Sequence, residues 1–273
     1  MEVLVNTSHV ILPALYTALV IAYARIFARG PSGLALFVRP LLIGTVAVHL
    51  ASIGLISAML GSCPLGSSAE FLSLMAFSIT VIYLVIELRW EDRTLGIFAI
   101  TPAFVLQVVA GVGILSRDGP PDVALGVRES LHIFAAIIGS AAVALASVFA
   151  LLYLFLYLAI KRGSFGLFYR KMPSLEKLSD LNVTGMSTAF LALTVTVALG
   201  VWDYVRGDAG SMSFFVQPAV LLTLLLWGIY GLSLVAQRFL QLGGKRLALV
   251  TLLGLPFLVA IVASGLFSSG FHA

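Results

Sequence analysis

The sequence predicts an all-α polytopic membrane protein, a bundle of eight transmembrane helices with both termini on the outer side of the membrane. Three observations lead to this prediction: the composition, the recurrence of long apolar runs, and the uneven distribution of basic residues. Of the 273 residues, 60% are hydrophobic and 10% are charged, whereas a soluble domain carries about 25% charged residues. This composition excludes a soluble enzyme, a disordered chain and a nucleic-acid binder, and it makes the lipid bilayer the first partner of the chain.

Eight apolar runs are long enough to cross a hydrocarbon core about 30 Å thick, which takes about 20 helical residues. The predicted spans are 8–27, 41–60, 69–88, 94–115, 131–160, 183–202, 214–236 and 247–267. Turn-forming residues close the first four runs: RGPSG, GSCPLGSS, RWEDRT and SRDGPPD. The fifth run exceeds the bilayer thickness, so this helix tilts or projects from the membrane. No linker is long enough to separate two domains, and we expect a single transmembrane domain over 1–273.

The orientation follows from the basic residues, which stay on the cytoplasmic side of a membrane protein. Alternate loops divide the 16 Lys and Arg into 13 on one side and 3 on the other. The larger set comprises Arg25, Arg29, Arg39, Arg89, Arg93, Lys161, Arg162, Arg170, Lys171, Lys177, Arg238, Lys245 and Arg246. The smaller set comprises Arg117, Arg128 and Arg206. Both termini are therefore predicted to face outward.

The longest cytoplasmic segment, 161–182, reads KRGSFGLFYRKMPSLEKLSDLN. Its pattern is compatible with a short amphipathic helix along the membrane interface. The basic cluster is interpreted first as an anchor of the topology, with attraction to anionic lipid as the alternative.

Ionisable groups within the spans are costly and are functional candidates for that reason. Glu87, near the cytoplasmic end of the third span, is predicted to form an interfacial ion pair close to Arg89 or to snorkel toward water. The spans contain no pair of buried acids, so a small-solute transporter has the least support. The single Cys63 excludes a disulfide within the chain, and we interpret it as an inert thiol on an outer loop.

Three of the four histidines, His9, His132 and His272, are placed at the outer face, while His49 lies about nine residues into the second span, near mid-membrane. Imidazole is the common axial ligand of heme iron, so outer histidines on neighbouring helix ends predict a heme site. Below His132, a stripe of small residues would admit a porphyrin or, as the commoner alternative, another helix. This stripe consists of Ala136, Ser140 and Ala144. His49 is equally compatible with a buried hydrogen bond between helices, and His9 and His272 with solvated interfacial side chains.

Several motifs occur in the order typical of one family. They are the stretch VHLASIGLISAMLGSCPLGSSAEFLSL with its mid-helix His, the run YLVIELRWEDRTLGIF, the histidine-led SLHIFAAIIGSAAVALASVFALLYL, and the connection MPSLEKLSDLNVTGMSTAFLALTVTVALG. Over about 40–267 the chain resembles the short, HemX-like branch of the CcsA cytochrome c assembly proteins.

The resemblance implies that the chain binds heme b in the bacterial cytoplasmic (inner) membrane and holds or presents it at the outer face. It implies His132 and His272 as ligands of the heme iron and His49 as a membrane histidine with a possible relay role. It further implies a ResB/CcsB-like membrane partner and an apocytochrome c as acceptor.

The chain also departs from the family's pattern. Of the tryptophan-rich external motif it retains only Trp202 and Asp203, which we include as candidate heme contacts, and Val235 lies near the expected place of a seventh-helix histidine. Independent heme lyase activity is therefore not expected, and an assembly factor rather than an enzyme is predicted. The alternative is a non-catalytic HemX-like membrane regulator or scaffold linked to heme biosynthesis, in which 161–182 contacts a cytoplasmic enzyme.

Overall fold

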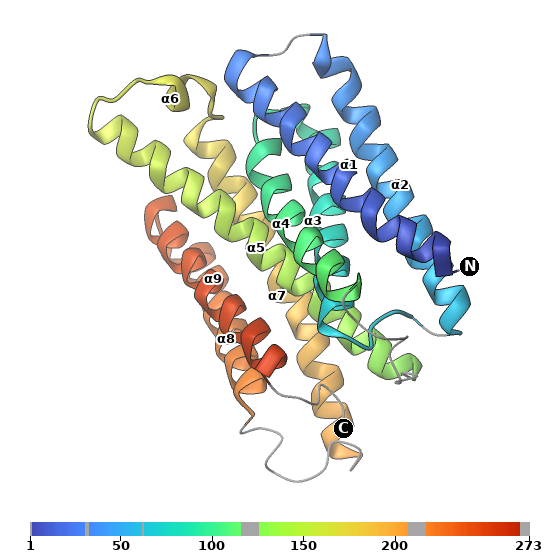
Figure 1. Cartoon of the computed structure of the whole chain (residues 1–273). Helices are drawn as coiled ribbons and strands as arrows, with labels where there is room; N and C mark the ends of the chain where they lie inside the picture. Colours follow the sequence, from blue (N-terminus) through green and yellow to red (C-terminus); the bar gives the residue numbers. More distant parts are fainter. Residues whose placement is uncertain (1, 31–32, 62, 116–125, 207–216, 268–273) are drawn as a thin grey trace. The chain divides into compact units, whose positions relative to one another are not determined.

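The computed structural model describes residues 2–30, 33–61, 63–115, 126–206 and 217–267, and within these ranges the chain forms nine helices and no strand (Figure 1). Eight of these helices are long and apolar enough to cross a membrane. The prediction of an all-α, multi-pass membrane protein with eight spanning helices is confirmed. The orientation of the termini stays a prediction.

The helices follow in chain order as α1 (Glu2–Arg29), α2 (Leu34–Leu60), α3 (Ser68–Trp90), α4 (Gly96–Leu115), α5 (Val127–Lys161), α6 (Leu167–Lys171), α7 (Leu175–Val205), α8 (Pro218–Leu240) and α9 (Gly244–Phe267). All but the five-residue α6 coincide with predicted spans, and the main differences lie at the ends.

Three helices begin well before their predicted starts, and the first of them, α1, begins at Glu2 rather than at 8. α2 begins at Leu34 rather than at 41, because the helix continues through Pro40 instead of starting after it. Membrane helices tolerate an internal proline since neighbouring groups satisfy the freed carbonyl. α7 begins at Leu175 rather than at 183, because the Ser174 side chain caps the helix by accepting a hydrogen bond from the Lys177 backbone N–H at 3.2 Å.

The early start of α7 also changes the interpretation of 161–182. Only α6, five residues long, forms a separate helix there, and the second half of the segment is the first part of α7. A short helix is thus present within the segment, and its position along the membrane interface stays a prediction. Between Lys161 and Arg170 the side chains are largely exposed.

The backbone contacts divide the chain into two compact units, residues 1–130 and 131–273. We call them unit 1 and unit 2; the prediction of a single transmembrane domain stays a prediction. In unit 1, α1 packs against α2 and α4, and α3 packs against α2 and α4. α3 starts with a reciprocal cap: Ser67 Oγ accepts from the Glu70 N–H at 3.2 Å, and Glu70 Oε2 accepts from the Ser67 N–H at 3.0 Å.

In unit 2, α7 packs against α8 and α9, and α8 packs against α9. α5 contributes an interior face of small residues to these helices. A Cβ atom added to Gly185 of α7 would lie 3.0 Å from the Ala146 Cβ of α5, and one added to Gly139 of α5 would lie 3.1 Å from Leu193 of α7. The glycines allow close helix packing, as small residues do at membrane helix interfaces.

Candidate functional site

The best-defined polar site of the chain lies in unit 1 around His49. The imidazole is 1% exposed and sits between α1 and α3. Its Nδ1 lies 3.1 Å from the Tyr16 hydroxyl oxygen, and its Nε2 lies 3.2 Å from Ser73 Oγ. The rings of Tyr16 and Phe77 meet the imidazole edge-on, with centroids 5.9 Å and 5.1 Å away. Both ring nitrogens are thus engaged inside unit 1.

These contacts belong to a longer chain of hydrogen bonds that joins all four helices of unit 1. Ser73 Oγ on α3 donates to Gln107 Oε1 on α4 at 3.0 Å, and Thr80 Oγ1 on α3 lies 3.0 Å from the Tyr16 oxygen on α1. The side chains of Tyr16, Thr80 and Gln107 are completely buried. Since the bilayer core offers no water as an alternative partner, these mutual hydrogen bonds lower the cost of burying five polar side chains here.

In one neutral tautomer of His49, Nε2 donates to Ser73 Oγ, which in turn donates to Gln107 Oε1, and Nδ1 accepts the proton of the Tyr16 hydroxyl. The chain runs from Thr80 through Tyr16, His49 and Ser73 to Gln107. It ends at Gln107 Nε2, a buried donor that has no hydrogen-bond partner among the described residues.

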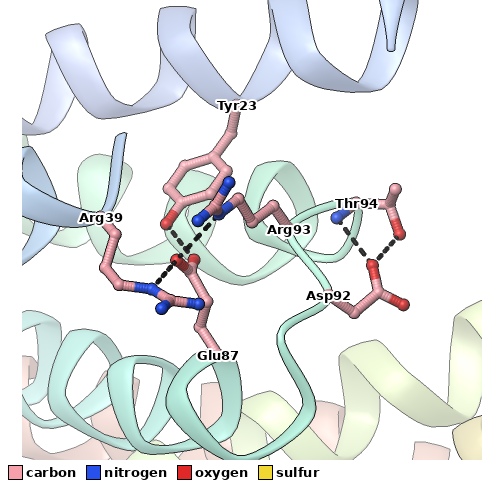
Figure 2. A network of polar contacts seen from close by, with 6 residues as sticks. All are labelled: Tyr23, Arg39, Glu87, Asp92, Arg93 and Thr94. Carbon is pink, nitrogen blue, oxygen red and sulfur yellow. Dashed lines mark hydrogen bonds and ion pairs between the residues drawn. The ribbon is translucent and has the colours of Figure 1, made fainter. Parts of the chain in front are cut away.

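A second polar cluster, centred on Glu87, lies near the C-terminal end of α3 (Figure 2). The Glu87 carboxylate is fully buried: Tyr23 donates to its Oε2 at 2.5 Å, and the Nε of Arg39 donates to its Oε1 at 3.4 Å. The Nε of Arg93 forms an ion pair with the same Oε1 at 3.7 Å. The predicted ion pair exists, but its partners differ from the predicted Arg89, and snorkelling is wrong. Residues two apart on a helix point to different sides, and the Arg89 guanidinium lies over the Trp90 ring instead.

The turn after α3 brings Arg93 back toward Glu87. Glu91 ends the helix in the left-handed conformation, with φ of 53°. Asp92 Oδ1 then accepts from the Thr94 backbone N–H at 2.9 Å and from the Thr94 hydroxyl at 2.6 Å. Figure 2 shows this closed turn beside the carboxylate cluster. Such aspartate turns fix the chain direction locally, so the position of Arg93 is built into the loop.

The two polar clusters share one face of α3. Ser73, Thr80 and Glu87 are spaced seven residues apart, which is close to two helical turns and about 10 Å along the axis. On α1, Tyr16 and Tyr23 repeat the same spacing and serve the same two clusters. Polar residues at heptad spacing within apolar spans are the signal in the sequence that could have located this seam. The candidate polar sites within the spans are predicted from histidines and charged residues, so Tyr, Ser and Thr at this spacing are missed.

The structure describes only part of the predicted outer heme site. His132 lies in the second turn of α5 and is half-buried, and below it Ser140 and Ala144 are buried at 7% and 8% exposure. His272 falls outside the described residues, as do the contacts it makes. Heme ligation by His132 and His272 therefore stays a prediction, and so does a relay role of His49. A metal bound to His49 would have to replace one of its two hydrogen bonds.

Trp202 and Asp203 lie in the last turn of α7. The indole of Trp202 is 53% exposed, and the Arg206 guanidinium covers one of its faces at 4.7 Å from the ring centroid. Among the described residues, no group of three or more His, Cys, Asp or Glu side chains is arranged to hold a metal ion. No protein-family model and no curated protein sequence matches this chain.

Proposed function

We propose that this protein is a heme-binding integral membrane component of c-type cytochrome biogenesis, which holds or presents heme b at the outer face of the bacterial cytoplasmic membrane. The observation that carries the proposal is the position of His132, a half-buried imidazole close to the start of a spanning helix. His49 is enclosed with both nitrogens hydrogen-bonded, so of these two histidines His132 is the more exposed. The ordered resemblance to the HemX-like branch of CcsA proteins supports the same role.

The imidazole of His132 is chemically suited to bind the heme iron at one axial position, because imidazole is a common axial ligand. His132 would supply this ligand and His272 the second one. The exposed indole of Trp202 offers a flat apolar surface for a porphyrin on the face that Arg206 leaves open, and Asp203 follows it directly. A ResB/CcsB-like membrane protein and an apocytochrome c are the partners that this role requires.

The test is the Soret absorbance of the purified full-length protein with added heme. We expect a Soret band that is lost or shifted in His132→Ala and His272→Ala, because each variant removes one axial nitrogen. His9→Ala is the matched control, since it removes a histidine from the same predicted face without touching the proposed pair. Absence of a Soret band, or a band unchanged in both variants, would overturn the proposal.

A second candidate, a HemX-like regulator or scaffold linked to heme biosynthesis, is favoured by the exposed segment between α5 and α7. Lys161, Arg162 and Arg170 are exposed there beside the exposed apolar side chains of Phe165 and Leu167. This role predicts that neutralising Lys161, Arg162, Arg170 and Lys171 to Gln abolishes the effect of the protein on heme synthesis in cells, while His132→Ala leaves it intact. The opposite pattern would exclude the scaffold.

A further inference from the structure

The Glu87 cluster carries more positive than negative charge. One buried carboxylate faces two guanidinium groups, those of Arg39 and Arg93, so the formal charge of the cluster is one unit positive. The tyrosine hydroxyl of Tyr23 already occupies the second carboxylate oxygen. The cluster therefore compensates Glu87 completely and retains one unit of positive charge at the edge of unit 1.

The two arginines also retain unused donors. Within the described residues, their hydrogen bonds and ion pairs involve only the ε nitrogens. Both side chains are 26% exposed, so part of each one is accessible from outside the packed bundle. Figure 2 shows the two guanidinium groups on either side of the same carboxylate, which holds them close together. Paired guanidinium forks bind the oxygens of a phosphate through several charge-assisted hydrogen bonds.

The surface next to Arg39 is apolar. On α2, Leu36 and Ile43 lie three residues before and four residues after Arg39, hence on the same face, and they are 75% and 47% exposed. Leu50 continues this exposed face toward the middle of the helix at 57% exposure. A ligand bound to the arginines through its anionic group would have exposed hydrocarbon beside it along α2. This combination matches an amphiphile rather than a small soluble anion.

We propose that Arg39 and Arg93, held together by Glu87, bind the phosphate group of an anionic phospholipid whose acyl chain lies along the exposed face of α2. Both arginines belong to the set predicted to be cytoplasmic, and basic pockets between helices at that side are where anionic headgroups bind. Glu87 acts as the organising residue: both ε nitrogens lie near the same carboxylate oxygen, Oε1, at 3.4 Å and 3.7 Å, which keeps the two guanidinium groups within reach of one ligand.

The experiment compares lipid affinity of delipidated full-length protein in detergent by native mass spectrometry. The probes are phosphatidylglycerol, phosphatidylcholine with identical acyl chains, and inorganic phosphate. The variant is Arg39→Lys with Arg93→Lys, which keeps Glu87 compensated and the fold intact but removes both planar forks. The matched control is Arg25→Lys with Arg89→Lys, two exposed arginines of unit 1 from the same predicted side.

We expect one phosphatidylglycerol to bind wild type more tightly than phosphatidylcholine, the double-lysine variant to lose about tenfold in this affinity, and the control to lose less than about twofold. Inorganic phosphate should compete only weakly, because it lacks the acyl chain. Equal affinity in wild type and variant, an equal loss in the control, or equal binding of phosphatidylcholine would overturn the proposal. Competition by inorganic phosphate at the affinity of the lipid would overturn the lipid as ligand. None of these outcomes bears on heme binding.

Discussion

The interiors of the two units differ in kind. In unit 1, the seam between α1, α2 and α3 is polar and includes the buried side chains of His49 and Glu87. In unit 2, the buried polar side chains of the described residues are neutral, and glycines let facing helices pack closely, as Gly185 does against Ala146. Across the described ranges, every buried His and Glu belongs to unit 1, and no Asp is buried in either unit. The difference indicates that unit 1 depends on matched polar partners, whereas unit 2 depends on close packing.

In unit 2 a side chain–side chain hydrogen bond joins Trp227 Nε1 to Thr194 Oγ1 at 2.8 Å, but two buried hydroxyls share a backbone acceptor. Tyr230 and Ser147 both donate to the backbone carbonyl of Thr251, at 3.1 Å and 3.4 Å. A backbone carbonyl is present whatever the side chain, so this acceptor does not depend on the identity of residue 251. In unit 1, each polar side chain of the seam depends on another side chain.

The largest effect is expected from removing both cations of the Glu87 cluster. Arg39→Leu with Arg93→Leu leaves a buried carboxylate without compensation and should destabilise the protein by about 3 to 5 kcal/mol, measured by denaturant unfolding in detergent. Adding Glu87→Leu to the same variant should restore most of this loss, because replacing a whole buried ionic group by apolar side chains is often neutral. If the triple variant is as unstable as the double one, the carboxylate is not the source of the effect.

A packing change in unit 2 is expected to have the next largest effect. Gly185→Leu would push its side chain into Ala146, whose Cα would lie 3.2 Å from the new Cβ atom, and overpacking of this kind costs about 1 to 3 kcal/mol. Gly228→Leu on α8 is the matched control, because no atom would lie within 4 Å of its Cβ. The control should be neutral or stabilising in the same unfolding assay; an equal loss for both glycines would contradict the packing argument.

A smaller loss is expected from interrupting the hydrogen-bond chain of unit 1. Ser73→Ala removes the partner of both His49 Nε2 and Gln107 Oε1, and buried side-chain bonds in membrane proteins contribute about 1 kcal/mol each. The expected loss is about 1 to 2 kcal/mol. Ser78→Ala on the same helix, equally buried but outside the chain of hydrogen bonds, should change stability less; equal losses would show that the chain contributes nothing specific.

The smallest effect is expected on the reactivity of the Cys63 thiol, which belongs to unit 1. Burial raises the pKa of the Cys63 thiol, and the negative charge of Glu70 raises it further. The neutral thiol dominates below that pKa, so the rate of maleimide labelling at neutral pH should be lower than for free cysteine and should rise about tenfold per pH unit up to the pKa. Glu70→Gln, which preserves the reciprocal cap, should lower the pKa and accelerate labelling. An unchanged rate would remove Glu70 as a cause.

The histidines illustrate how far sequence reasoning reaches. The sequence identifies His49 as a mid-membrane histidine with two open roles, and its geometry is that of a hydrogen-bonded residue between helices. It does not identify the partners Tyr16 and Ser73, because hydroxyl side chains are common in apolar spans and do not stand out as candidates. The sequence shows Glu87 to be a charged group that is costly to bury in a span. Its partner is not Arg89, two residues away, but Arg39, 48 residues away.

The sequence by itself determined the eight spanning helices, because crossing a bilayer requires a local run of apolar residues whose length can be counted along the chain. Turn-forming residues also indicate where the first four spans end, whereas the starts of α2 and α7 differ from the predicted ones. Only the tertiary structure decided which polar groups meet: Glu87 with Arg39, Arg93 and Tyr23, and His49 with Tyr16 and Ser73. These pairs depend on which helices are neighbours and how each is rotated, and hydropathy along the chain contains neither quantity.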